Sequence, residues 1–221
     1  MADGSGGDDR PLIAVLDYGI GNLRSAQKAL EHVGADARLT ADKALIADAA
    51  GVVLPGVGAF GRCVEALGEA GLADVAHEAA SVAADGTGRP FLGVCVGLQM
   101  LFDGSDENPE VPGLGVVPGR VHLLPEGVKR PQMQWNVLRW SGPTSMADGL
   151  EPDPWVYFVH SYWAQPDDPS YVAATCDYGI EVTAAVARGR MWATQFHPEK
   201  SAANGLRILE NFVAETRAGV R

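Results

Sequence analysis

Hydrophobic runs alternate with helix-like segments through the first half of the chain. Runs without polar alternation are typical of strands buried on both faces of a parallel sheet, and the segments between them have hydrophobic positions at helical spacing. Strands are predicted at residues 12–16, 36–40, 51–54 and 91–95, and helices at residues 23–33, 41–50, 60–67 and 72–84. This alternation predicts a doubly wound α/β fold, whose active sites lie at the carboxyl ends of the strands.

The second half changes character, because strand-like segments follow one another with short turns. They span residues 120–124, 135–140, 155–160, 171–177, 181–187 and 190–196, and a terminal helix is predicted at residues 201–213. Arg188 and Gly189 are expected to close a hairpin. With no repeat and no linker, these strands are expected to extend one mixed, mostly parallel sheet rather than build a second domain. The polar stretch 103–119 predicts a long functional loop near the site.

Length and composition favour a single domain. A chain of 221 residues with 47% hydrophobic content is long enough for one well-packed core. Residues 1–10 are small, polar and acidic, so they are predicted to be a disordered lead-in. The domain is therefore expected to span residues 11–221.

The charge of the chain and the sequence of its first residues limit the classes of partner and the compartment to be expected. Its 17 basic and 28 acidic residues give a formal net charge of −11, which argues against nucleic acid or an anionic membrane as a partner. The start lacks the features of a signal peptide, so a cytoplasmic protein is expected. Three cysteines and five histidines show no disulfide or metal-ligand spacing, so no metal and no cofactor is expected. Cys63 and Cys176 are interpreted as packing residues.

The predicted strand at residues 91–95 ends in a Gly-x-Cys-x-Gly pattern around Cys95. A tight strand-to-helix turn strains its central residue and needs small neighbours two positions away, which Gly93 and Gly97 supply. Such a nucleophile elbow would place the Cys95 sulfur at a helix N-terminus, where the helix dipole favours thiolate. The alternative is a buried packing cysteine.

A His-Pro-Glu sequence after the last predicted strand offers two further catalytic groups. A cysteine nucleophile needs a base, and the base needs an acceptor that fixes its tautomer. His197 and Glu199 can fill these roles, because residues two apart in an extended backbone project to the same side. The alternatives are a strand-end histidine and a solvated acid, but the combination with Cys95 favours catalysis.

Two glycines flank Val57 after the third predicted strand. Gly56 and Gly58 allow the Val57 peptide two orientations at little steric cost. One orientation would present an N–H group that, with the Val96 N–H of the elbow, could stabilise an oxyanion. A simple β-to-α turn would explain the glycines equally.

The elbow and the late His-Pro-Glu together resemble the triad, or class I, glutamine amidotransferases, which have a flavodoxin-like domain. More narrowly, the chain resembles the glutaminase subunits of imidazole glycerol phosphate synthase, an enzyme of histidine biosynthesis. The matching segments are residues 17–22, 55–60, 93–102, 133–136, 157–162 and 195–201. One departure is Gln134, where many members have Gly.

The resemblance implies hydrolysis of L-glutamine to glutamate and ammonia. Cys95 would attack the carboxamide, and His197, oriented by Glu199, would protonate the departing ammonia. The oxyanion would bind Val57 and Val96, and glutamine would bind Gly56, Gly58, Gln99, Glu107, Ser161 and Tyr162. Gln99 is also credible from its position one helical turn after the nucleophile, whereas Glu107 could equally be a solvated loop acid.

The resemblance also implies a heterodimer with a cyclase subunit, a (β/α)₈ barrel that uses the ammonia to make imidazole glycerol phosphate and the aminoimidazole carboxamide ribotide. The docking face would lie at or near Asn22, Trp135, Tyr157 and Lys200. Two alternatives stay open. One is a glutaminase of another synthase or a γ-glutamyl hydrolase, which segments 17–22 and 133–136 disfavour. The other is a non-catalytic subunit, which the intact Cys, His and Glu disfavour.

Overall fold

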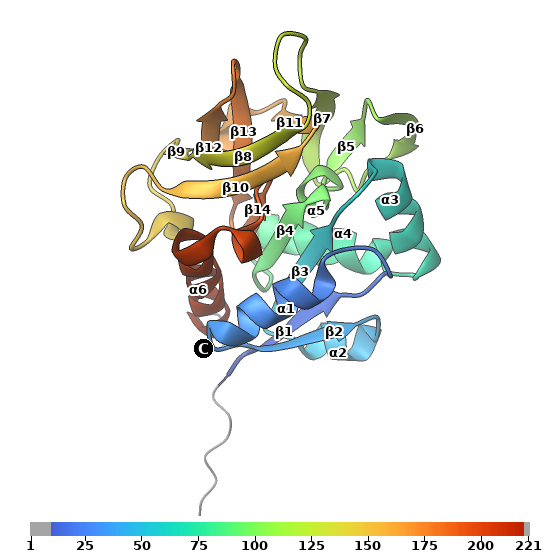
Figure 1. Cartoon of the computed structure of the whole chain (residues 1–221). Helices are drawn as coiled ribbons and strands as arrows, with labels where there is room; N and C mark the ends of the chain where they lie inside the picture. Colours follow the sequence, from blue (N-terminus) through green and yellow to red (C-terminus); the bar gives the residue numbers. More distant parts are fainter. Residues whose placement is uncertain (1–9, 219–221) are drawn as a thin grey trace, which may run out of the picture.

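The computed structural model describes residues 10–218, which form three sheets and their covering helices (Figure 1). Residues 1–9 of the predicted lead-in lie outside the described residues. The largest sheet has eight strands, in the spatial order β2 (Asp36–Thr40), β1 (Leu12–Leu16), β3 (Gly51–Gly56), β4 (Phe91–Cys95), β14 (Met191–Thr194), β13 (Glu181–Arg188), β12 (Val172–Asp177) and β9 (Arg139–Trp140). Strands β1 to β4 and β14 pair in parallel, and β9, β12 and β13 add antiparallel pairs. The predicted doubly wound, mixed sheet is therefore confirmed.

The helices cover both faces of this sheet. In Figure 1, α1 (Leu23–His32) and α6 (Ala202–Ala218) lie in front of it and α4 (Ala73–Ala84) lies behind. Two further helices, α2 (Lys43–Asp48) and α3 (Phe60–Glu69), follow β2 and β3. Asn22 directly precedes α1, but its side chain makes no capping bond, and its Oδ1 accepts a hydrogen bond from Ser25 Oγ at 2.8 Å.

The prediction that all strands of the second half extend the large sheet was wrong. A two-stranded antiparallel ribbon is formed by β8 (Gln132–Val137) and β10 (Trp155–His160). The predicted strand at 135–140 divides at the buried Leu138, because β8 joins the ribbon whereas β9 joins the main sheet. The predicted hairpin at Arg188 and Gly189 is confirmed, since Arg188 pairs with Met191.

The stretch 103–119, predicted as a loop, is mostly strand. A third sheet consists of β11 (Tyr162–Pro166), β7 (Val117–Leu123), β5 (Phe102–Ser105) and β6 (Asn108–Pro112). Pro109 and Pro112 lie in the edge strand β6, where a missing N–H need not interrupt a ladder. The short strand β11 was missed entirely.

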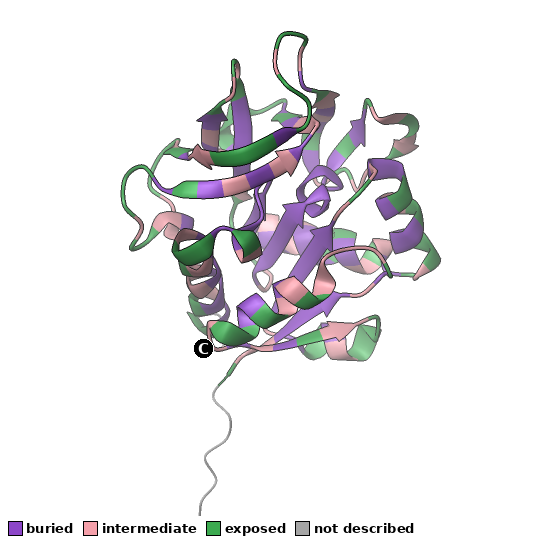
Figure 2. Ribbon diagram, viewed as in Figure 1, coloured by how far each residue is buried: buried purple, intermediate pink, exposed green. Residues whose placement is uncertain are grey.

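The core lies around the centre of the main sheet. Strands β3, β4 and β14 are buried along their whole length (Figure 2), as the absence of polar alternation predicts. Among residues 10–218, no helix combines the length and apolar character needed to cross a membrane. The buried strands β3, β4 and β14 thus end together at one edge of the sheet.

Candidate active site

The site forms where β3, β4 and β14 end side by side. Strand β4 pairs in parallel with both neighbours, and Gly56 at the end of β3 lies opposite Cys95 at the end of β4. The loop with Val57 and the segment with His197 leave the sheet at this same edge. This is the carboxyl edge at which open α/β sheets bind their ligands.

Cys95 has the strained backbone of a nucleophile elbow. Its φ of 57° and ψ of −110° lie in a region that non-glycine residues rarely adopt. The glycines around it are sterically required. A Cβ on Gly97 would overlap the Leu54 carbonyl, and one on Gly93 would lie 2.9 Å from the Gly97 oxygen. The four-residue helix α5 (Val96–Gln99) starts directly after Cys95.

His197 and Glu199 form a buried pair. His197 Nδ1 lies 2.8 Å from Glu199 Oε1, and both side chains are only 3–4% exposed. The extended backbone expected between them is not present, because Pro198–Lys200 forms the 3₁₀-helix η3. The single 3₁₀ turn brings the carboxylate back to the ring. Burial lowers the pKa of His197, but hydrogen bonding to Cys95 and Glu199 outweighs this and raises it to about 9.

The main chain of His197 is tied to strand β10. The His197 N–H donates to the Tyr157 carbonyl at 3.1 Å. The buried Ser201 hydroxyl donates to the His197 carbonyl at 2.6 Å and accepts from the Tyr157 N–H at 2.9 Å. The histidine is therefore held on both sides by one residue of the ribbon.

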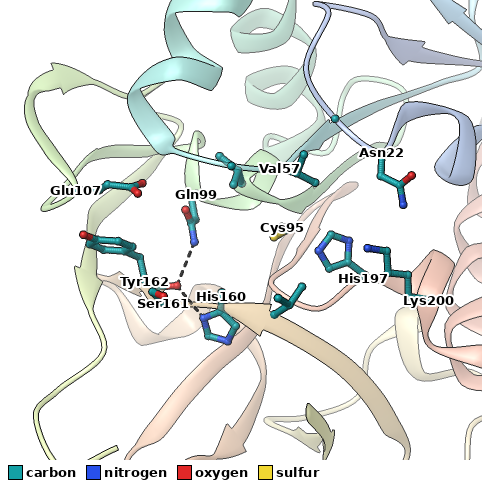
Figure 3. A pocket seen from close by; sticks show the side chains of 14 residues that line it. Asn22, Val57, Cys95, Gln99, Glu107, His160, Ser161, Tyr162, His197 and Lys200 are labelled. Carbon is teal, nitrogen blue, oxygen red and sulfur yellow. Dashed lines mark hydrogen bonds between the residues drawn. The ribbon is translucent and has the colours of Figure 1, made fainter. Parts of the chain in front are cut away.

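A cavity of about 560 Å³ opens in front of Cys95 (Figure 3). Its volume suits a small polar metabolite. The lining residues are Gly21, Asn22, Val57, Gly58, Cys95, Val96, Gln99, Glu107, Val159, His160, Ser161, Tyr162, His197 and Lys200. Of the residues named from the sequence, Gly56, Trp135, Tyr157 and Glu199 are not in this lining.

Gln99 is buried and fixed at the side of the cavity. Its Nε2 donates to the Tyr162 carbonyl and to Gln195 Oε1, each at 3.1 Å. Gln195 Nε2 lies in turn 3.8 Å from Cys95 Sγ. Sequence reasoning missed Gln195, although it directly precedes Phe196 and His197.

Glu107 bridges the cavity and helix α3. One carboxylate oxygen, Oε2, accepts a hydrogen bond from the Phe60 N–H at 2.7 Å, and the neighbouring Asn108 accepts one from the Gly61 N–H at 2.9 Å. Glu107 is therefore not merely a solvated loop acid. A negative charge at a helix N-terminus is also favoured by the helix dipole.

His160 lines the cavity and was also missed, although it ends a predicted strand just before Ser161 and Tyr162. Its Nδ1 lies 2.8 Å from the Tyr162 carbonyl, which can only accept, so Nδ1 carries the proton. Burial lowers the pKa of His160 to about 4. The ring is thus neutral near pH 7 and its Nε2 is an acceptor.

Exposed hydrophobic side chains gather on the ribbon beside the cavity. Met133, Trp135 and Trp155 are 61%, 44% and 54% exposed. Trp135 lies opposite Tyr157 in the ladder, with ring centroids 6.1 Å apart. Of the four residues named for docking, Trp135 and Tyr157 lie on the ribbon, whereas Asn22 and Lys200 line the cavity.

Comparison with known proteins gives the family. The sequence profile of the family "Glutamine amidotransferase class-I" matches residues 14–216. Two relatives carry the name imidazole glycerol phosphate synthase subunit HisH. The one from Synechococcus elongatus is 48% identical over 212 residues, covering 94% of this chain and 95% of the relative. The one from Methanothermobacter thermautotrophicus is 46% identical over 210 residues, covering 94% and 100%.

Solved structures agree on the fold. A crystal structure of a glutamine amidotransferase has a TM-score of 0.71 at 21% identity, covering 92% of this chain and 98% of the other. PurLQS from Thermotoga maritima has a TM-score of 0.72 at 20% identity, covering 93% and 98%. From its profile and its relatives, the chain belongs to the class-I glutamine amidotransferase family, together with the HisH subunits of imidazole glycerol phosphate synthase.

Proposed function

We propose that this chain is the glutaminase subunit of an imidazole glycerol phosphate synthase. It hydrolyses L-glutamine to glutamate and ammonia and supplies the ammonia to a cyclase subunit in histidine biosynthesis. The observation that carries the proposal is a strained Cys95 facing the same cavity as His197, whose Nδ1 binds the buried Glu199. The identity of 46–48% to HisH subunits selects the synthase.

The reaction starts from a Cys95 thiolate and a His197 imidazolium. Glu199 holds the proton on Nδ1, which leaves Nε2 for the reacting groups. The thiolate attacks the carboxamide carbon, and the Val57 and Val96 N–H groups stabilise the oxyanion. When the C–N bond breaks, His197 gives its Nε2 proton to the leaving nitrogen and ammonia departs. His197 then takes a proton from water, which cleaves the glutamyl thioester and restores the thiolate and the imidazolium.

Glutamine binds along the cavity lining away from His197. Ser161, Tyr162 and Gln99 line that end together with Glu107. Glu107 Oε2 accepts a hydrogen bond from the Phe60 N–H, and the carboxylate binds the α-ammonium group of the substrate through its second oxygen. Gly56 and Gly58 shape the loop above the carboxamide. Gly56 packs so tightly against the elbow that an added Cβ would lie 2.8 Å from the Gly97 nitrogen.

The cyclase, a (β/α)₈ barrel, docks on the ribbon and the mouth of the cavity. Trp135 and Tyr157 offer an aromatic pair, the residue type that most often anchors interfaces. Asn22 and Lys200 lie at the cavity itself, so a subunit seated there would also close it. The ammonia would then leave toward the partner instead of into solvent.

The cytoplasm is the compartment that suits this chemistry. Cys63, Cys95 and Cys176 are all free thiols. A nucleophilic cysteine has to stay reduced, and the cytoplasm keeps thiols reduced.

The test is an ammonia-release assay of the full chain alone, with the cyclase barrel, and with the barrel plus its phosphorylated ribosyl substrate. We expect little release from the chain alone and a rise mainly in kcat when partner and ligand are present, because an oxyanion contact is made chiefly in the transition state. No ammonia under any condition would overturn the glutaminase activity. Release that the barrel does not change would instead point to a different synthase.

A further inference from the structure

Two side chains that are not part of the cavity lining bind backbone carbonyls of the loop around Val57. The buried Tyr18 hydroxyl donates a hydrogen bond to the Pro55 carbonyl at 2.5 Å. The Cys63 thiol, from the first turn of α3, donates one to the Val57 carbonyl at 3.3 Å. The two side chains lie within hydrogen-bonding reach of each other.

These two bonds lie on either side of a single peptide. The Pro55 carbonyl belongs to the Pro55–Gly56 peptide, and the Val57 carbonyl belongs to the Val57–Gly58 peptide. Between them is the Gly56–Val57 peptide, which carries the Val57 N–H. The two bonds therefore hold the peptides before and after the Gly56–Val57 peptide, and neither bond uses the Val57 N–H.

The first turn of α3, which carries Cys63, is held in place by hydrogen bonds. The first N–H groups of α3 donate to Glu107 at 2.7 Å and to Asn108 at 2.9 Å, and Cys63 is fully buried. Burial raises the pKa of the Cys63 thiol, which keeps the S–H proton available as a donor. The sequence-based interpretation of Cys63 as a packing residue is therefore incomplete.

We infer that Cys63 is a positioning residue for catalysis: its thiol, together with the Tyr18 hydroxyl, holds the Val57 loop so that the Val57 N–H reaches the oxyanion formed on Cys95. Cys63 does not touch the substrate, since it lies behind the loop and outside the cavity lining. It acts through the Val57 carbonyl. This inference rests on the proposed glutaminase function.

The first measurement compares Cys63→Val, Cys63→Ala and Cys63→Ser in the full chain with the cyclase partner. Val and Ala both remove the donor, one filling the space and the other leaving it, whereas Ser retains a donor. We expect kcat for glutamine to fall about tenfold in the Val and Ala variants with KM unchanged, which is part of the 10² to 10³ that a lost oxyanion donor costs. Cys63→Ser should stay near the wild-type kcat, and Tyr18→Phe should fall like Cys63→Val.

The second measurement uses L-glutamate γ-semialdehyde as an inhibitor. Its aldehyde carbon takes the Cys95 sulfur and its oxygen takes the Nε2 proton of His197, giving a hemithioacetal that occupies the place of the tetrahedral intermediate. The inhibition constant should weaken by the same factor as kcat in Cys63→Val, whereas the affinity for glutamate should not change. Cys176→Val is the matched control, because Cys176 is also buried but lies in β12 and contacts Gln132.

The outcomes separate the two proposals. A wild-type kcat in Cys63→Val or Cys63→Ala would overturn the positioning role. It would also be overturned if kcat of Cys63→Ser fell as far as that of the Val and Ala variants, or if the variants raised KM instead of lowering kcat. If the wild-type chain releases no ammonia with its partner, the glutaminase function fails instead. Equal losses in Cys63→Val and Cys176→Val would show a general packing effect and overturn the inference.

Discussion

At the scale of single residues, the site depends on two histidines in opposite charge states. His197 lies between a sulfur and a carboxylate, which raise its pKa to about 9. His160 lies in the same cavity lining, but its one hydrogen-bond partner within residues 10–218 is a carbonyl, and burial lowers its pKa to about 4. The same side chain therefore supplies a proton donor at one position and a neutral acceptor at the other.

The triad residues should behave as one unit. We expect Cys95→Ser and His197→Ala each to lower kcat by about 10³ or more, and the double variant to be no slower than the slower single variant. Glu199→Gln should retain more activity, because it changes only the orientation and charge of the histidine partner. Ammonia release and thermal unfolding of the purified variants check this, and additive losses in the double variant would contradict a triad.

His160 should make the protein sensitive to acid. Burial first, and then the nearby charge of His197, lowers its pKa from 6.5 to about 4, whereas the hydrogen bond to Tyr162 opposes this. Stability is therefore fully present above pH 6.5 and is lost as the pH falls toward 4, by about 3 kcal/mol in total.

Denaturant unfolding of the wild type and of His160→Asn between pH 7 and pH 4 checks this. The carboxylates titrate in both proteins, so the difference between the two curves isolates the histidine. We expect the variant to lose less stability than the wild type over this range. Parallel curves would contradict the buried, neutral state of His160.

At the scale of elements, Ser201 links the turn η3 to strand β10 by hydrogen bonds. Ser201→Ala removes two hydrogen bonds between them and should lower the free energy of unfolding by about 1–3 kcal/mol. It should also lower kcat without raising KM, because His197 loses its support. Thr216→Val in α6 is the matched control, since it removes a buried hydroxyl bonded to the Val213 carbonyl far from the site. It should lower the Tm and leave kcat unchanged.

The elements differ in how well their sequence predicts them. Buried central strands such as β1 and β4 have a continuous apolar run, and their bounds follow from it. In the region 102–123 only the end of β7 was predicted, as part of the strand at 120–124. Strands β5 and β6 could not be predicted, because they are short and β6 contains prolines at the edge of its sheet. The ribbon of β8 and β10 could likewise not be told from an extension of the main sheet.

The candidate site shows the same division. Cys95 and Gly97 could be named because their geometry is local, within one strand–turn–helix unit. The role of Gln195 depends on contacts with Gln99 and Cys95, 96 and 100 residues away along the chain, which no local pattern records. The hydrogen bonds of Cys63 and His160 join residues that are close in sequence, but residue types alone do not show which backbone carbonyl each side chain binds. His197 and Glu199 were paired correctly, although a 3₁₀ turn and not an extended backbone brings them together.

At the scale of the whole molecule, one face combines the cavity mouth and the exposed aromatic ribbon. Trp135→Ala and Tyr157→Ala should each weaken binding of the proposed cyclase subunit by about tenfold or more and lower ammonia transfer, while the fold stays intact. Arg38→Ala is the control, because this exposed residue of β2 lies at the far edge of the main sheet (Figure 1). Titration of the cyclase subunit onto each variant checks this, and unchanged affinity in both aromatic variants would contradict docking at the ribbon.

The bonds between Tyr157 and His197 limit how this surface can change over evolution. Those bonds use only the backbone of Tyr157, so the outward side chains of the ribbon are free to vary with a new partner. An insertion or deletion in β10, in contrast, would shift the register and move the catalytic base. Lineages should therefore exchange partners by substitution on this strand and keep its length constant.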